Sequence, residues 1–293
     1  MRLLIAGAQG QLARAMIELA PSAEDVTAFA VGRPALDLTA PSSVLRTLAD
    51  FKPDVIVNAA AYTAVDRAEQ EPDAAMALNA QGPRRLAEAV ERMGALLIHI
   101  STDCVFDGAK PTPYVEDDAT APLSVYGRSK LAGEEAVRAA APRHIILRTS
   151  WVFSPYGSNF LTRMIGLARE RDELRVVDDR MGCPTYAPHL AAAILGVARA
   201  ATAAPHRGTW GTYHGAGTGS TTWCGFAREI MRVSGAHGGP SVPVVPITTA
   251  EYPTPAIRPV NSRLDSSKLT AVFDVGLPPW QQGVAECMAR LRE

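Results

Sequence analysis

The chain begins with an apolar run, which is followed directly by a glycine turn and then by a helical pattern. Residues 1–6 (MRLLIA) are typical of a strand buried on both faces of a parallel sheet. Gly7 and Gly10 follow in the spacing Gly-x-x-Gly-x-x-Ala, and helical periodicity begins at Leu12. Gly7 permits a tight turn, and Gly10 lets the backbone approach a pyrophosphate at the helix N-terminus. This context predicts a Rossmann-type dinucleotide-binding fold, with an ordinary strand–helix connection as the alternative.

Strand and helix patterns continue to alternate through the first half of the chain. A long helix is predicted from 72 to 93, and another contains Tyr126 and Lys130. Short apolar runs predict four more strands, at 26–31, 53–58, 95–100 and 144–148. This order predicts an α/β fold, a doubly wound parallel sheet whose ligands collect beyond the carboxyl ends of the strands.

After about Trp151 the pattern loosens, and glycine, proline and aromatic residues become dense. We therefore predict a dinucleotide-binding Rossmann domain over residues 1–150 and a smaller, loop-rich α/β substrate domain over residues 151–293. A strand and a helix between about 174 and 200 are expected to return to the first sheet, so the boundary is not a single cut.

Composition argues against several classes of function. The 29 basic and 30 acidic residues are spread evenly and give a net charge of −1, which does not favour a nucleic-acid or membrane surface. The first strand begins at once and is too short for a signal peptide or a membrane span. The four cysteines show neither metal spacing nor a disulfide framework. We therefore expect a cytoplasmic protein that binds no metal.

Tyr126 and Lys130 are four residues apart, which places their side chains on one helix face with Cβ atoms roughly 5–6 Å apart. An ammonium beside a phenol favours the phenolate, so we expect Lys130 to lower the pKa of Tyr126 from its reference value near ~10. Such a tyrosine can exchange a proton with a substrate oxygen. The spacing alone also fits a solvated helix face. The glycine turn and the strand-end residue Thr102 favour the catalytic interpretation.

Five further motifs are found at 58–66 (NAAAYTAVD), 101–108 (STDCVFDG), 148–152 (RTSWV), 182–185 (GCPT) and 252–265 (YPTPAIRPVNSRLD). With the glycine turn and the Tyr126–Lys130 pair they resemble the extended short-chain dehydrogenase/reductases, and more closely the dTDP-4-dehydrorhamnose reductase family. The similarity runs from Arg2 to about Trp280. One departure is Cys104, where the family usually has tyrosine, and this puts fine substrate selectivity in doubt.

The resemblance implies reduction of the C4 ketone of dTDP-4-dehydro-β-L-rhamnose to dTDP-β-L-rhamnose by NAD(P)H, the final step of dTDP-rhamnose biosynthesis. It implies that Tyr126 donates a proton to the carbonyl oxygen. Lys130 would lower the pKa of the tyrosine and bond the nicotinamide ribose hydroxyls. Thr102 would hydrogen-bond the ketone oxygen.

The end of the second predicted strand bears on the choice of cofactor. It carries no carboxylate, and Arg33 follows it. A guanidinium suits a 2′-phosphate, so we expect NADPH to be preferred and NADH to be possible, although Arg33 also fits a solvated loop. By the resemblance, Asp37 and Leu38 lie beside the adenine. The other expected cofactor contacts are Gly7, Gly10, Gln11, Leu12, Ala60, Ala61, Tyr62, Thr63, Ile100, Tyr126 and Lys130.

The expected substrate contacts lie mostly in the second half of the chain. By the resemblance, Trp151 packs on the deoxyhexose; a tryptophan of the domain interface is the alternative. Asn159 and Phe160 open a predicted helix N-terminus suited to a pyrophosphate oxygen. Arg258 and Arg263 are expected to neutralise the diphosphate. The remaining expected substrate contacts are Thr102, Asp103, Asn261 and Ser262.

Two alternatives stay open. One is another nucleotide-sugar short-chain enzyme, such as an epimerase or a dehydratase, although Asp103 is followed by Cys104 and not by the glutamate expected of a dehydratase. The other is a catalytically idle NADP-binding regulatory subunit, since the β subunit of methionine adenosyltransferase resembles this family. We expect a dTDP-sugar as the partner, and a monomer or a homodimer.

Overall fold

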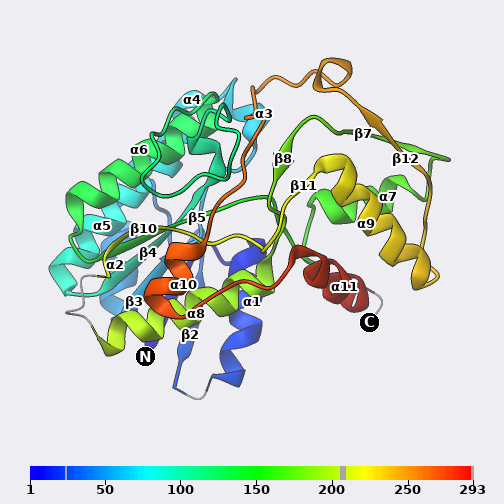
Figure 1. Ribbon diagram of the computed structural model, residues 1–293. Coiled ribbons are helices and arrows are strands. Elements are labelled where there is room, and N and C mark those ends of the chain that lie inside the picture. Colours follow the sequence, from blue (N-terminus) through cyan, green and yellow to red (C-terminus); the bar gives the residue numbers. More distant parts are fainter. Residues whose placement is uncertain (24, 205–208, 292–293) are drawn as a thin grey trace.

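The larger of two lobes is built around a six-stranded sheet (Figure 1). The computed structural model describes residues 1–23, 25–204 and 209–291. All neighbouring strands of this sheet run parallel, in the order β10–β5–β4–β3–β1–β2. The strands are β1 (Arg2–Ala6), β2 (Thr27–Val31), β3 (Val55–Asn58), β4 (Leu96–Thr102), β5 (His144–Thr149) and β10 (Gly211–His214). The predicted doubly wound α/β fold is confirmed.

The strand order changes direction at β1, which has β2 on one side and β3 on the other. Chain segments therefore leave the carboxyl ends of β1 and β3 in opposite directions. In open parallel sheets the crevice at such a point is where ligands bind. The glycine turn follows β1 directly, so the topology places it beside this crevice.

Helices cover both faces of the sheet because successive strand residues point to opposite sides. Leu3 and Ile5 of β1 belong to the core formed with α1, α8 and α10, whereas Leu4 belongs to the core formed with α2, α5 and α6. These helices are α1 (Gln11–Leu19), α2 (Pro41–Phe51), α5 (Gly82–Met93), α6 (Val125–Ala140), α8 (Ala187–Ala203) and α10 (Ser267–Phe273). Within the described ranges, no helix combines the length and the apolar character needed to cross a bilayer.

The segment predicted as one helix from 72 to 93 is interrupted. After the short α3 (Val65–Ala68), the chain forms α4 (Pro72–Met76), a π-helical turn (Ala77–Gln81) and then α5. Asn79 in this turn is fully buried, and its amide nitrogen donates to the Tyr62 carbonyl at 3.0 Å and to Ser129 Oγ of α6 at 2.9 Å. These hydrogen bonds connect the irregular turn to the helix that carries Tyr126 and Lys130.

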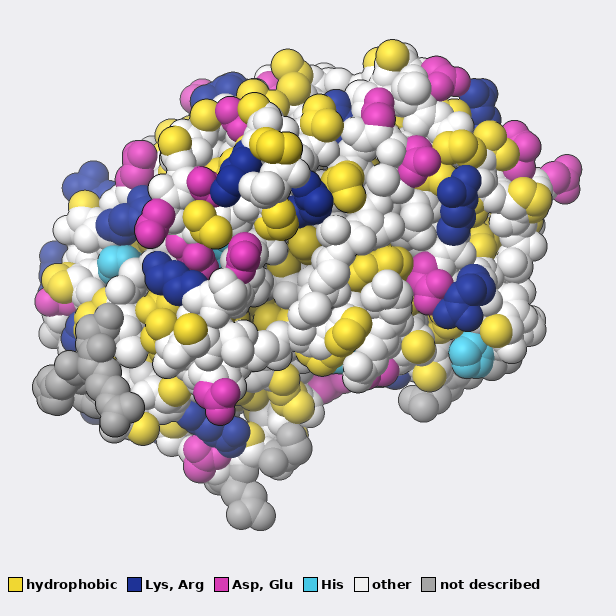
Figure 2. Space-filling model, in the orientation of Figure 1, with side chains coloured by type: hydrophobic (Ala, Val, Ile, Leu, Met, Phe, Trp, Pro, Cys, Tyr) yellow, Lys and Arg dark blue, Asp and Glu magenta, His cyan; other side chains and the backbone are white. Residues whose placement is uncertain are grey.

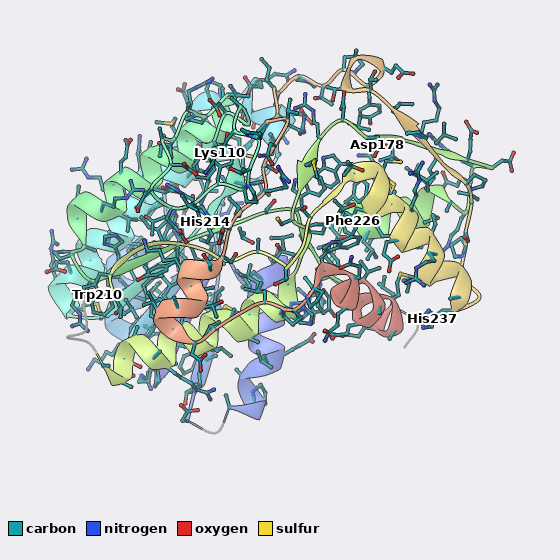
Figure 3. All side chains as sticks on the ribbon, viewed as in Figure 1. Lys110, Asp178, Trp210, His214, Phe226 and His237 are labelled. Carbon is teal, nitrogen blue, oxygen red and sulfur yellow. The ribbon has the colours of Figure 1, made fainter. Side chains whose placement is uncertain are left out.

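The smaller lobe contains α7 (Phe160–Leu167), α9 (Trp223–Ala236) and α11 (Trp280–Arg290). Phe226 on α9 points into its core, where its ring packs on those of Phe160 and Trp280 (Figure 3). Short strand pairs complete the lobe: β7 (Leu174–Val177) with β12 (Val244–Ile247), β6 (Val152–Phe153) with β9 (Thr185–Tyr186), and β8 (Met181–Gly182) with β11 (Thr221–Thr222).

The prediction that a strand near residue 174 returns to the main sheet is wrong. Strand β7 pairs with β12 in the smaller lobe, and the strand that returns is β10. Helix α8 does return, and it packs against α1. The sequence concealed β10 because its four residues run straight into a glycine-rich stretch at 215–219. The larger lobe therefore consists of the first 150 residues together with α8, β10 and α10 (Figure 1).

Candidate active site

The glycine turn after β1 has the geometry that a phosphate requires. Gly7 has φ +106°, and a Cβ at this position would lie 3.0 Å from the backbone nitrogen of Ala60, so no larger residue fits without strain. Gly10 is the N-cap of α1, and no side chain caps the first turn of that helix. The first backbone N–H groups of α1 are therefore directed out of the helix end, as in helix N-termini that bind phosphates.

A cavity of about 1140 Å³ extends from this turn along the carboxyl edge of the sheet. It exceeds the ~300–1,000 Å³ typical of small-molecule sites. Every residue that the sequence assigned to the cofactor lines it except Tyr62, whose hydroxyl donates to Glu71 Oε2 at 2.7 Å. The lining includes Gly7, Gly10, Gln11, Leu12, Arg33, Asp37, Leu38, Ala60, Ala61, Thr63, Ile100, Tyr126 and Lys130, together with Thr102, Asp103 and Trp151 from the expected substrate contacts.

Helix α6 brings Tyr126 and Lys130 to the end of β4. Its N-cap is Ser124, whose Oγ accepts the Gly127 N–H at 3.1 Å. A Cβ at Gly127 would lie 2.3 Å from the Cys104 carbonyl oxygen, so the glycine lets the helix approach the turn that follows Thr102. The structure thus brings Thr102, Tyr126 and Lys130 together in the lining of one cavity.

The ammonium of Lys130 donates to the Ile100 carbonyl oxygen at 2.6 Å. Burial lowers the pKa of Lys130 to about 8, and the carboxylate of Glu134 acts in the opposite direction. Two of the three ammonium N–H groups remain for other partners.

The prediction that Lys130 lowers the pKa of Tyr126 is wrong for this structure. The pKa of Tyr126 is raised, first by burial and also by the nearby Asp103 carboxylate, while a hydrogen bond with Thr102 opposes this. Lys130 is not among the groups that influence the phenol. Its ammonium is bonded to the β4 backbone, and helical spacing alone does not show where a side chain ends.

Asp103 is buried beside Thr102 and accepts several hydrogen bonds. Thr102 Oγ1 donates to Asp103 Oδ1 at 2.9 Å, and Ser150 Oγ donates to Oδ2 at 2.8 Å. Burial raises the pKa of Asp103, and the bonds from Ser150, Ser262 and Thr102 oppose this. Burial also raises the pKa of the neighbouring Cys104 thiol, so this cysteine is not an activated thiolate.

Trp151 occupies the junction of the two lobes. Its backbone is left-handed, with φ 45°, which is rare for a bulky residue. The ring stacks on Trp223 of α9, with centroids 3.5 Å apart. Sequence reasoning missed Trp223. The sequence feature that could have indicated it is a tryptophan at the start of a helix in the loop-rich half of the chain.

Asn159 and Phe160 open α7, as the sequence predicted, but their groups are engaged within the smaller lobe. Asn159 Oδ1 accepts the Thr162 N–H, and its amide nitrogen donates to the Ser154 carbonyl at 2.8 Å. The Phe160 ring packs against Trp223. Neither residue lines the large cavity.

The polar residues at 258–263 lie outside the lining of the large cavity. Arg258 forms a two-point ion pair with Asp66 of the larger lobe, at 2.9 and 2.7 Å. Asn261 donates to the carbonyls of Lys110 and Thr112, and Arg263 bonds Asn261 and the Pro111 carbonyl. Arg263 lines a second cavity of about 400 Å³.

Ser262 lies against the site from the smaller-lobe side. It is buried, its hydroxyl is 3.2 Å from the Met181 carbonyl oxygen, and it hydrogen-bonds Asp103. Of the expected substrate contacts at 258–263, it is therefore the one that reaches the carboxylate beside Thr102.

A glycine turn, a strand-end threonine and a Tyr-x-x-x-Lys helix around one cavity define the class of short-chain dehydrogenase/reductases, which are dinucleotide-dependent oxidoreductases. The whole chain, residues 1–293, matches the family described as "RmlD substrate binding domain". The chain belongs to the dTDP-4-dehydrorhamnose reductase family.

Relatives of similar length support this assignment. The chain is 48% identical to dTDP-4-dehydrorhamnose reductase of Sinorhizobium fredii, over 96% of this chain and 95% of that one. It is 42% identical to the Burkholderia thailandensis enzyme of the same name, over 99% of both chains.

Solved structures agree with this assignment. The dTDP-4-dehydrorhamnose reductase of Clostridium acetobutylicum superposes with a TM-score of 0.91 at 37% identity over 100% of both chains. The Bacillus anthracis enzyme, in complex with NADP, gives 0.89 at 37% identity over 99% of both. A UDP-glucose 4-epimerase of Brucella ovis shares only the fold, at 16% identity over 99% of this chain and 98% of that one, with a TM-score of 0.81.

Proposed function

We propose that this chain reduces the C4 ketone of dTDP-4-dehydro-β-L-rhamnose to give dTDP-β-L-rhamnose, with NADPH as the reductant. The observation that carries the proposal is the meeting of Thr102, Tyr126 and Lys130 on the wall of a cavity that also contains the glycine turn. Full-length relatives named for this reaction support it.

The residues of the cavity fit NADPH. Gly7 leaves no room for a larger side chain beside Ala60, and the turn presents the N-terminus of α1 to the pyrophosphate. Lys130 offers two N–H groups to the ribose hydroxyls. When bound, NADPH supplies a hydride to the carbonyl carbon.

Two charged residues near the end of β2 support the preference for NADPH. Arg33 lines the cavity, and its guanidinium is a suitable partner for a 2′-phosphate. Asp37 also lines the cavity, but its Oδ1 accepts the backbone N–H and the hydroxyl of Thr39 at 2.8 and 2.7 Å. The bonds from Thr39 are the largest cause of a lowered Asp37 pKa, and the positive charges of Arg33 and Arg85 lower it further. The local charge is therefore favourable to an anionic phosphate.

Tyr126 is the proton donor of this proposal. Because its pKa is raised, the phenol is fully protonated at neutral pH. Transfer of its proton to the C4 oxygen is still downhill, since an alkoxide is a far stronger base, with a conjugate acid comparable to water at ~15.7. Thr102 now donates to Asp103, so it aligns the ketone oxygen by exchanging that acceptor for the substrate.

The substrate side involves both lobes. Trp151 and Trp223 provide a stacked aromatic surface at the lobe junction, where an apolar sugar face packs well. Arg258 reaches the substrate diphosphate by leaving Asp66. We also propose a cytoplasmic location, supported by four cysteines that are all unpaired.

The test is a Tyr126→Phe variant assayed for NADPH oxidation with the dTDP-keto sugar. Removing the general acid should lower turnover by about 10²–10⁴-fold. The Kd for NADPH should stay within about twofold, because the phenol hydroxyl is a minor contact of the cofactor. Unchanged turnover in the variant would contradict the assignment, and a wild-type protein that binds NADPH but never oxidises it would favour the idle-subunit alternative.

A further inference from the structure

A buried ion pair lies behind the catalytic helix. Glu134 of α6 is 0% exposed and Arg148 of β5 is 2% exposed. Arg148 Nε and Nη2 donate to the two carboxylate oxygens of Glu134 at 2.9 and 2.8 Å. Arg138, which is partly exposed, adds a third bond to Glu134 Oε2 at 2.6 Å. Moving a carboxylate and a guanidinium out of water costs desolvation free energy, so a buried ion pair need not stabilise the fold. We therefore ask what else this pair does.

Glu134 and Lys130 fasten successive turns of α6 to adjacent residues of β4. Lys130 donates to the Ile100 carbonyl at 2.6 Å, and Glu134 accepts from Ser101 Oγ at 2.6 Å. The next residue of the strand is Thr102. The two contacts therefore set the register of α6 against the strand end that holds the third catalytic group.

Among the residues that the structure describes, a single carboxylate influences the pKa of Lys130. On α6 this is Glu134, while Tyr126 has a raised pKa and is uncharged at neutral pH. From β4, His99 is fully buried with a pKa well below its usual value, so it is neutral too.

The remaining titratable and charged groups around Lys130 act on its neighbours. Asp103, in the 3₁₀ turn after β4, has a raised pKa and influences Tyr126 and Cys104. Arg148 of β5 and Arg138 of α6 both contact Glu134. His214 of β10 contacts Arg148, with its Nε2 3.5 Å from Arg148 Nη1.

We propose that Glu134 is a positioning residue: it fixes α6 against β4 and keeps Lys130 cationic for the anionic cofactor. The cofactor part of this inference rests on the proposed function. This role goes beyond packing. A glutamine at position 134 has the same shape and can keep the bond to Ser101, but it lacks the negative charge.

The experiment measures the affinity for NADPH, without substrate, from pH 6 to pH 10 by cofactor fluorescence. Affinity should fall through an alkaline limb as Lys130 loses its proton. In Glu134→Gln this limb should move to lower pH by at least about 1 unit, a tenfold change in the proton affinity of Lys130. Glu135→Gln is the matched control, because Glu135 is on the same helix and exposed.

Arg138→Gln supplies a second variant at a partly exposed position, where folding is less at risk. Removing this cation leaves the Glu134 charge less compensated, so the limb should move to higher pH by a smaller amount. Opposite shifts in the two variants support the proposal, since a packing role alone weakens binding without moving either limb.

Distinct outcomes separate the two proposals. A limb that stays within about 0.3 unit of wild type in Arg138→Gln, or moves to lower pH, overturns the role of Glu134 even if Glu134→Gln does not fold. A wild-type protein that binds no NADPH at any pH overturns the proposed function together with this inference.

Discussion

We compare the free energy of unfolding of a Lys130→Met variant with that of wild type. The variant minus wild-type difference should be more favourable to the variant at pH 7 than at pH 10. The side chain is 2% exposed, and its pKa falls from 10.5 to about 8 on folding. The folded state therefore binds fewer protons than the unfolded state between these two values, and wild-type stability rises with pH in that window. Methionine does not titrate, so the variant lacks this rise.

The magnitude follows from the pKa difference. At ~1.36 kcal/mol per pKa unit, moving from 10.5 to about 8 corresponds to about 3 kcal/mol, of which about 2–3 kcal/mol develops between pH 7 and pH 10. The free energy of unfolding of the variant minus that of wild type should fall by this amount over that range. Below pH 8 the buried, charged ammonium lowers the free energy of unfolding. We attribute its presence to the role proposed for Lys130 in the site.

The assay is urea unfolding followed by tryptophan fluorescence, without cofactor, at pH 7 and pH 10. Taking the difference between the variant and wild type cancels the titration of all other groups. Lys52→Met, which removes an exposed lysine, is the matched control. The reasoning is refuted if the Lys130→Met difference is flat. The same variant should lose NADPH affinity at pH 7 and less of it at pH 10, where wild-type Lys130 has already lost its charge.

Three further results are expected. Gly7→Ala should weaken NADPH binding about tenfold or more, because the left-handed φ and the contact with Ala60 oppose a Cβ; an unchanged Kd in isothermal titration would contradict this. Arg33→Ser should lower the ratio of kcat/KM for NADPH to that for NADH about tenfold or more, and an unaltered ratio would remove Arg33 from cofactor selection. Trp223→Ala should raise the substrate KM several-fold with little change in the cofactor KM, and the reverse pattern would place Trp223 outside the sugar surface.

Strong local patterns made most of the sheet predictable. Apolar runs marked five of the six strands, and the glycine turn marked where the first one ends. Strand β10 escaped because a four-residue run beside glycines carries too little periodicity. The π turn around Asn79 was also concealed, since its sequence is as helical as its flanks and its shape depends on bonds to Tyr62 and Ser129.

The residues of the site were predictable to the same extent: local patterns indicated some of them, and contacts between distant segments were not indicated. Thr102 and the Tyr126–Lys130 pair were predictable because strand ends and helix spacing fix positions along the chain. Partners across the fold were not: Arg258 pairs with Asp66 and Lys130 with the Ile100 carbonyl. These contacts depend on how elements far apart in sequence pack, and no local pattern encodes them.

The charged side chains of the surface agree with the even composition. Figure 2 shows basic and acidic side chains interspersed over the visible face. This distribution matches the net charge of −1 and gives no single-sign field over that face.

The return of α8 and β10 to the larger lobe has a practical consequence for dissecting the protein. A fragment that stops at residue 150 lacks β10, so β5 becomes an unpaired sheet edge. It also lacks Leu190 and Ile194 of α8, which cover the side of the sheet that carries Leu3 and Ile5. An open edge beside a bare apolar face is a template for aggregation. Truncation at the apparent domain boundary should therefore yield insoluble protein, and the nucleotide-binding half is best studied within the whole chain.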